Sequence, residues 1–118
     1  MKDVSQLERQ VQRYISRLQG VVRKIVTDYL KMEEPQSLKF VRVGISPLPD
    51  GTYKLSIKIY HSKPLKLESI NEIVRRLRRY VNVSEWRICA PHAGAIRIEA
   101  QLSIDLLQEL LTSSGVVR

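Results

Sequence analysis

The stretch 39-KFVRVGISPLPDGTYKLSIKIY-60 decides the fold of this chain of 118 residues. Apolar and polar residues alternate in its two halves, Lys39–Ser46 and Tyr53–Tyr60, and this two-residue period is typical of a half-buried β-strand. Between the halves, Asp50-Gly51 tolerates the positive φ that a tight turn needs. The stretch therefore predicts a β-hairpin with one apolar face.

An amphipathic helix is predicted on each side of this hairpin. Residues from about 4 to 32 carry apolar side chains at alternating steps of three and four, which indicates one long helix. Its stripe consists of Val4, Leu7, Val11, Tyr14, Leu18, Val21 and Ile25, widened by Ile15, Val22, Val26 and Tyr29. The stripe is wider than a coiled-coil seam, so we expect one edge to pack on a sheet and the other to be available to another chain.

A second helix is expected from about Ser69 to Val81, after Pro64. Ser69 and Glu72 have the spacing of a capping box, in which each side chain satisfies a backbone N–H of the first turn. The residues expected to be buried are Ile70, Ile73, Val74, Leu77 and Val81.

A second hairpin and a short helix complete the pattern. The expected strands carry Trp86, Ile88 and Ala90, then Ile96, Ile98, Ala100 and Leu102, with a turn at Pro91–Gly94. The last helix is expected from Ile104 to about Thr112. The order α-β-β-α-β-β-α predicts one α+β domain over 1–118: a two-layer sandwich of a four-stranded, mainly antiparallel sheet with the helices on one face.

Charge and composition limit the classes of function. Lys and Arg number 20 against 12 Asp and Glu, and the formal net charge of +8 is typical of a protein with a polyanionic partner. A hydrophobic fraction of 43% indicates a folded domain rather than a disordered basic tail. With no signal-peptide core or membrane-spanning stretch in the sequence, we expect a cytoplasmic protein without a membrane partner. Abundant Arg and scarce Asn lean toward a thermophilic source, with compositional drift as the alternative.

The most concentrated positive charge is the run 75-RRLRR-79 in the second expected helix. Leu77 belongs to the apolar stripe, and the four arginines fan across the outer half of the helix. Glu72 can pair with two of them but cannot neutralise the group. Cations also lie opposite the stripe of the first helix, at Arg9, Arg13, Arg17, Lys24 and Lys31. A charge run on a helix is usually a solvated face, so we interpret the run as the edge of a distributed positive surface.

Strand alternation places another set of cations on one face of the sheet. If the apolar residues face the helices, the other face carries Arg42, Lys54, Lys58, Arg87 and Arg97, the rings of Phe40 and Tyr60, and one acid, Glu99. Cations follow phosphates and rings stack on bases, so such a face suits single-stranded nucleic acid. The plain alternative is that the outer face of a sandwich must be polar and that Lys and Arg fill it.

We therefore expect a small, basic, non-catalytic protein that binds single-stranded RNA or DNA and needs no cofactor or metal. The predicted contacts are Arg42, Lys54, Lys58, Tyr60, Phe40, Arg87 and Arg97, extended by Arg75, Arg78 and Arg79. The alternative is a structural or adaptor subunit that forms a homodimer or docks a partner protein through the first helix.

An enzyme is the least favoured class. His61 and His92 have no carboxylate cluster near them in the sequence, which makes a poor metal site. The single cysteine, Cys89, excludes an internal disulfide and a Cys-based zinc finger. Cys89 and His92 lack a third orienting group, so we expect Cys89 to be a buried or incidental thiol rather than a nucleophile.

Overall fold

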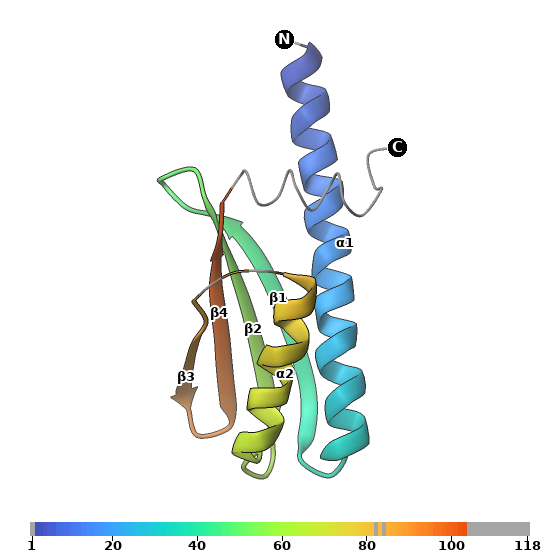
Figure 1. Cartoon of the computed structure of the whole chain (residues 1–118), viewed down its shortest axis with the longest axis vertical. Coiled ribbons are helices and arrows are strands. Elements are labelled where there is room, and N and C mark those ends of the chain that lie inside the picture. Colours follow the sequence, from blue (N-terminus) through green and yellow to red (C-terminus); the bar gives the residue numbers. More distant parts are fainter. Residues whose placement is uncertain (1, 82, 84, 104–118) are drawn as a thin grey trace.

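The described part of the chain is a sheet with helices on one of its faces. The computed structural model describes residues 2–81, 83 and 85–103. Its elements are, in order, α1 (Lys2–Glu33), β1 (Leu38–Pro47), β2 (Tyr53–His61), α2 (Leu67–Tyr80), β3 (Arg87–His92) and β4 (Ala95–Leu102). Both helices lie on the same face of the four strands (Figure 1), which confirms the predicted α+β sandwich. The helix expected from Ile104 to Thr112 lies outside the described residues.

The sheet is antiparallel, with strand order β1-β2-β4-β3. The predicted turn joins β1 to β2: Gly51 has a φ of 89°, and the Asp50 carboxylate accepts a hydrogen bond of 3.0 Å from the Thr52 N–H. β4 then pairs with the other side of β2. Strands β2 and β4 are therefore central, and β1 and β3 are the edges.

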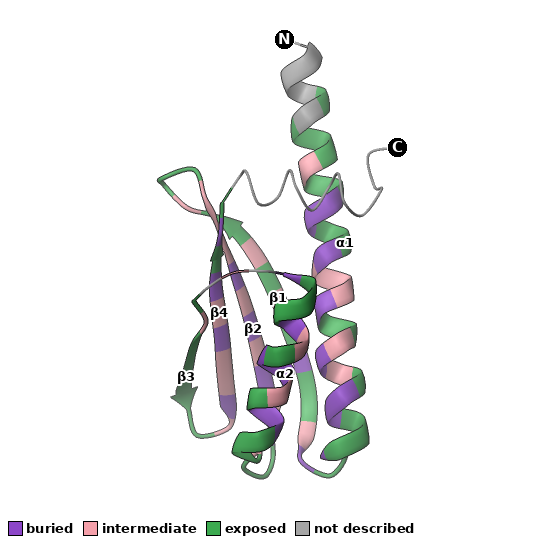
Figure 2. Ribbon diagram, viewed as in Figure 1, coloured by how far each residue is buried: buried purple, intermediate pink, exposed green. Residues whose placement is uncertain are grey.

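The core lies between the helices and the inner face of the sheet, and it is mostly aliphatic, with Tyr14 and Tyr29 of α1 among its buried members. Leu55, Ile57 and Ile59 of β2 are all 0% exposed, and Ile98 of β4 lies opposite Ile57. Each such side chain contributes roughly 1.5–3 kcal/mol through burial. Figure 2 shows this buried band along the central strands. The predicted stripe of the second helix is confirmed, because its members are buried: Ile70, Ile73, Val74, Leu77 and Val81.

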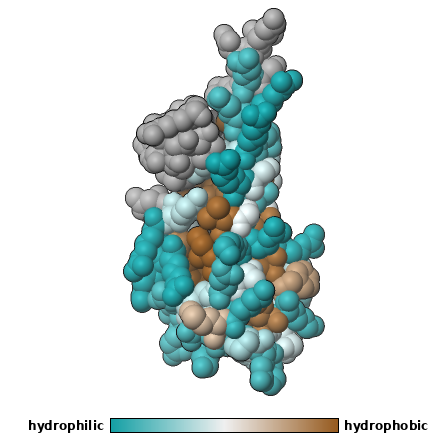
Figure 3. All heavy atoms as spheres, turned by 90° about the vertical axis from the view of Figure 1, so that its right-hand side faces the viewer, coloured by the Kyte–Doolittle hydropathy of each residue, from teal (hydrophilic) through white to brown (hydrophobic). Residues whose placement is uncertain are grey.

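The buried side of α1 is rotated from the centre of the predicted stripe. Val22 and Val26, which widen that stripe on one side, are fully buried, whereas Val11, Val21 and Ile25 are only half-buried. The reason is that α1 packs against β1 on one side and α2 on the other. Figure 3 shows apolar surface in the middle of the α1 side of the molecule, bordered by hydrophilic side chains.

The predicted capping box of α2 is wrong. The helix begins at Leu67, and its N-cap residue is Lys66, whose side chain makes no cap hydrogen bond. Ser69 is consequently buried within the first turn. The Lys66 N–H instead donates to Oε2 of Glu34, a buried carboxylate that follows α1, at 3.1 Å. A contact between distant parts of the chain therefore sets the start of this helix.

Strand β3 differs from the prediction in exposure and in its turn. All its residues are exposed, and Ile88, expected to face the helices, is 46% exposed. The reason is that β3 is an edge strand and that neither α1 nor α2 covers it (Figure 1). Pro91 and His92, predicted to lie in the turn, belong to β3, so the turn between paired His92 and Ala95 is Ala93–Gly94 alone.

Candidate nucleic-acid interface

The sheet face away from α1 and α2, here the open sheet face, carries a row of cations aligned by the strand register. Arg42 of β1 pairs with Lys58 of β2, and Lys58 pairs with Arg97 of β4. Neighbouring strands lie about 4.7–4.9 Å apart, and directly paired residues point to the same side of a sheet. Arg42, Lys58 and Arg97, which we call the basic row, therefore follow one another across three strands.

Two aromatic rings, here the aromatic stack, lie beside the basic row. Phe40 pairs with Tyr60 across β1 and β2, and their ring centroids are 4.3 Å apart with the planes 18° from parallel. The Lys58 Nζ is 5.2 Å from the Tyr60 ring centroid, and the His92 ring lies 6.2 Å from Tyr60, tilted by 43°. Phe40 is 50% exposed, so the stack presents apolar ring surface to the solvent.

The cations of the basic row also act on the Tyr60 phenol. The Lys58 ammonium beside the hydroxyl lowers the pKa of Tyr60 below its ordinary value, and Arg42 acts in the same direction. The direction follows because both cations stabilise the negative charge that a phenolate would carry. The same field attracts other anions, and phosphate oxygens are the anions of a nucleic acid.

One acid lies at the outward positions of the described strands, and it only partly offsets the cations. Glu99 Oε2 is 2.9 Å from Lys54 Nζ and 4.0 Å from Arg97 Nη1. Arg87 of β3 lies opposite Glu99 in the register. Lys54, Arg87 and Glu99 also line a hollow of about 500 Å³ on the sheet. The structure thus brings all five predicted strand cations to one face and shows that Lys54 is the most neutralised of them.

Small residues of β1 and β2 border the basic row on the side away from the aromatic stack, and Glu99 follows them on β4. Gly44 pairs with Ser56, and a Cβ added at Gly44 would meet no atom of the described residues within 4 Å. This part of the surface is open beside the row. An extended chain has room to lie against the strands there.

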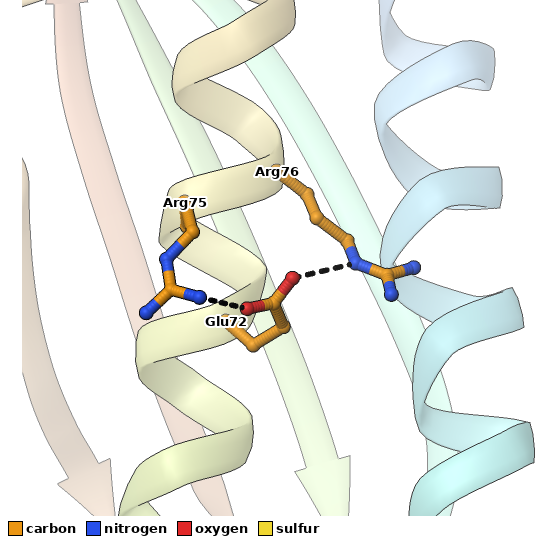
Figure 4. A network of polar contacts seen from close by, with 3 residues as sticks. All are labelled: Glu72, Arg75 and Arg76. Atoms are coloured by element: carbon orange, nitrogen blue, oxygen red, sulfur yellow. Dashed lines mark hydrogen bonds and ion pairs between the residues drawn. The ribbon is translucent and has the colours of Figure 1, made fainter.

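The arginine run of α2 belongs to the other layer of the molecule. Glu72 accepts hydrogen bonds from Arg75 at 2.8 Å and from Arg76 at 3.0 Å (Figure 4). The pKa of Glu72 is lowered, first by the Arg76 hydrogen bond and then by the neighbouring charges. The Arg76 side chain extends toward α1, where its guanidinium lies 4.5 Å from the Tyr29 ring centroid. Arg76 therefore links the two helices.

The remaining arginines of the run, Arg78 and Arg79, are exposed and make no ion pair with a described residue. Because α2 covers the inner face of the sheet and the basic row lies on the outer face, the structure does not bring these residues to the row. The predicted extension of the site through Arg75, Arg78 and Arg79 therefore has no geometric support.

Strand β3 adds two side chains that were not among the predicted contacts. His92 reaches the aromatic stack because it pairs with Ala95, which in turn pairs with Tyr60. Cys89 lies opposite Arg97 and is exposed, so of the two expectations, a buried or an incidental thiol, the buried one is wrong. Only the pairing of β4 with both neighbours reveals these placements. Among the residues that the structure describes, no group of three or more His, Cys, Asp and Glu side chains is arranged to hold a metal ion.

Comparisons of the chain with protein-family models, with curated proteins and with solved structures find no match. Within the described ranges, neither helix is both long and apolar enough to cross a membrane. The case for a function therefore rests on the chemistry of the open sheet face.

Proposed function

We propose that the protein binds single-stranded nucleic acid, RNA or DNA, on the open sheet face and does not alter it chemically. The observation that carries the proposal is the basic row beside the exposed aromatic stack. Arg42, Lys58 and Arg97 contact successive phosphates, and Phe40 with Tyr60 stacks on a base. Stacking of this kind is worth about 1–3 kcal/mol per base and tolerates any sequence.

The electrostatic repulsion within the basic row supports a binding role over a merely solvated face. Like charges placed directly opposite each other on neighbouring strands destabilise a sheet. The row holds two such pairs in succession, Arg42 with Lys58 and Lys58 with Arg97. A face that only needs to be polar is better served by alternating charges, whereas a phosphate backbone relieves the repulsion when it binds.

The shape of the face favours single strands over a duplex. In a duplex the bases stack on one another, so their flat surfaces are not available to a protein ring, and sequence-reading proteins insert a helix or a β-ribbon into a groove. Here the ring surface of Phe40 is exposed on the sheet itself. An unpaired base can lie on that ring while its phosphates contact the basic row.

Fluorescence anisotropy tests the proposal with labelled oligo(U), oligo(dT) and a duplex of matched length. We expect the single strands to bind more tightly than the duplex, and binding to weaken steeply with salt because phosphate contacts release counterions. The variant Arg78→Ala/Arg79→Ala is the control, since it removes two positive charges from the helical layer. Absence of measurable affinity at low salt for every RNA and DNA tested would refute the proposal.

A second candidate is a structural or adaptor subunit that self-associates through α1. The half-buried Val11 and Val21 favour it, because they leave an apolar edge on a helix that already packs on the sheet with its other edge. Light scattering over a range of concentrations distinguishes the states. We expect a dimer that Val21→Lys converts to a monomer, and a wild-type protein that stays monomeric would eliminate this candidate.

A further inference from the structure

We propose that the groove between α1 and the edge of β1 continues the nucleic-acid site around the edge of the sheet. In this arrangement, which rests on the proposed function, one bound strand contacts both the basic row and the groove. The groove, here the α1–β1 groove, has a volume of about 460 Å³ and is formed by one side of α1 and by the first residues of β1. It is a different surface from the open sheet face, and no residue of the basic row lines it.

The α1–β1 groove is strongly basic. Arg23, Lys24 and Lys31 of α1 and Lys39 of β1 line it, together with one acid, Asp28. Lys24 forms an exposed ion pair of 3.1 Å with Asp28. Arg23, Lys31 and Lys39 are exposed and make no ion pair with any described residue. Three cations are therefore available along the groove to an anionic ligand.

Phe40 connects the groove to the open sheet face. Its ring stacks on Tyr60 beside the basic row, and the same residue lines the α1–β1 groove. Lys39 precedes it on β1, at an irregularity of the strand register, and also lines the groove. A strand that stacks a base on Phe40 therefore passes from Arg42 on one side of the ring toward Lys39 and Lys31 on the other.

A nucleic acid fits this groove better than an extended acidic peptide does. A peptide would gain its affinity by adding a strand to the edge of β1, through regular main-chain hydrogen bonds. The register of β1 is irregular between Leu38 and Phe40, at the wall of the groove, and irregularities of this kind oppose edge-to-edge pairing. Phosphates need only the cations, whose long side chains adapt to a flexible backbone.

The test compares oligonucleotides of different length on matched variants. Labelled oligo(U) of 4 and of 12 nucleotides is titrated by anisotropy between 50 and 200 mM salt, on the wild type, on Lys31→Ala/Lys39→Ala and on Arg78→Ala/Arg79→Ala. Each variant loses two positive charges, but only the first loses them from the groove. Thermal unfolding of both variants confirms that the exposed substitutions leave the fold intact.

We expect the salt slope to change only for the longer oligonucleotide on Lys31→Ala/Lys39→Ala, here the groove variant. A phosphate contact contributes about 0.7 to the slope of log K against log salt for a single strand, so losing two lowers the slope by about 1.4. Raising the salt from 50 to 200 mM should then weaken binding of the longer strand to the groove variant by a factor about sevenfold smaller than for the wild type. The shorter strand should bind the groove variant within about twofold of wild type, because separated charges are screened at these salt concentrations.

Three outcomes overturn the inference while leaving the proposed function intact. In the first, the groove variant Lys31→Ala/Lys39→Ala changes the salt slopes of both oligonucleotides equally. In the second, the Arg78→Ala/Arg79→Ala control shows the same change of slope as the groove variant. Polyglutamate that binds the wild type but not the groove variant, with unchanged oligonucleotide slopes, assigns the groove to an acidic protein and also overturns it. If neither length binds the wild type at low salt, the proposed function fails and the inference fails with it.

Discussion

Replacing Arg42 with Gln separates a binding role of the basic row from a structural one. Arg42 lies opposite Lys58, is exposed and makes no ion pair with a described residue. Gln keeps a polar side chain and removes the positive charge. The substitution therefore changes the electrostatics of the row and leaves the packing of the inner face untouched.

The size of the effect follows from the number of phosphates that the row can contact. With three contacts, the slope of log K against log salt is about −2.1 for a single strand, so binding weakens roughly twentyfold between 50 and 200 mM salt. With Arg42→Gln the slope becomes about −1.4 and the loss about sevenfold. Anisotropy with labelled oligo(U) of 4 nucleotides measures both slopes, because a strand of that length spans the row without the groove.

Two further quantities should change in Arg42→Gln, the free energy of unfolding and the pKa of Tyr60. Removal of one member of a like-charged pair should leave the free energy of unfolding unchanged or raise it, by about 0.2–1 kcal/mol in denaturant titrations. The pKa of Tyr60 should rise toward its ordinary value, since Arg42 contributes to lowering it, and ultraviolet absorbance of the phenolate follows that change. Arg79→Gln, which removes the same charge from α2, should alter none of these quantities.

A role of Arg42 in phosphate binding is refuted if the salt slope of Arg42→Gln equals that of the wild type, or if Arg79→Gln lowers the slope equally. In the first case the row does not contact phosphates. In the second case binding responds to total charge and not to position. A loss of stability above about 1 kcal/mol would mean that Arg42 has a structural role that the register does not suggest.

Three other substitutions test the aromatic stack and the packing of the two layers. Phe40→Leu should weaken oligonucleotide binding by about 1–3 kcal/mol with an unchanged salt slope, because it removes a stacking ring and no charge. Burial, and secondarily Tyr80, raises the pKa of Tyr14 from 10.0 to about 12. The neutral phenol is therefore favoured in the folded state. The free energy of unfolding is unaffected below pH 10 and falls by roughly 1.4 kcal/mol per pH unit from there toward 12. Tyr14→Phe should abolish this decline in denaturant titrations. Glu34→Ala leaves the Lys66 N–H without its carboxylate and should lower the free energy of unfolding by about 1–3 kcal/mol, with faster hydrogen exchange at Lys66.

Sequence alone predicts the faces of the strands because their period is local. Alternation from Lys39 to Tyr60 is enough to put Arg42, Lys58 and the aromatic pair on the outer face, and the turn at Asp50-Gly51 sets them opposite each other. A hairpin joins strands that are neighbours in the chain. The faces of these two strands and their turn could therefore be predicted, whereas the register irregularity between Leu38 and Phe40 could not.

Features that depend on non-neighbouring elements could not be predicted. The third member of the row, Arg97, reaches Lys58 only because β4 pairs with β2 instead of β1, and the sequence does not specify that choice. The exposure of Ile88 has the same origin, since its strand alternates like a buried one but lies at the edge. The start of α2 depends on Glu34, a residue far away in the sequence, and this contact overrides the local capping signal at Ser69.

The density of arginines along the sequence is therefore a poor guide to where positive charge is available. Half of the run 75-RRLRR-79 is engaged within the helical layer, because Arg75 and Arg76 bind Glu72 and Arg76 also lies over Tyr29. The basic row draws its members from three separate strands and includes no acid. A phosphate chain beside an unpaired base gains most where aligned cations meet an exposed ring. Phe40 meets both conditions, since the basic row lies on one side of it and the α1–β1 groove on the other.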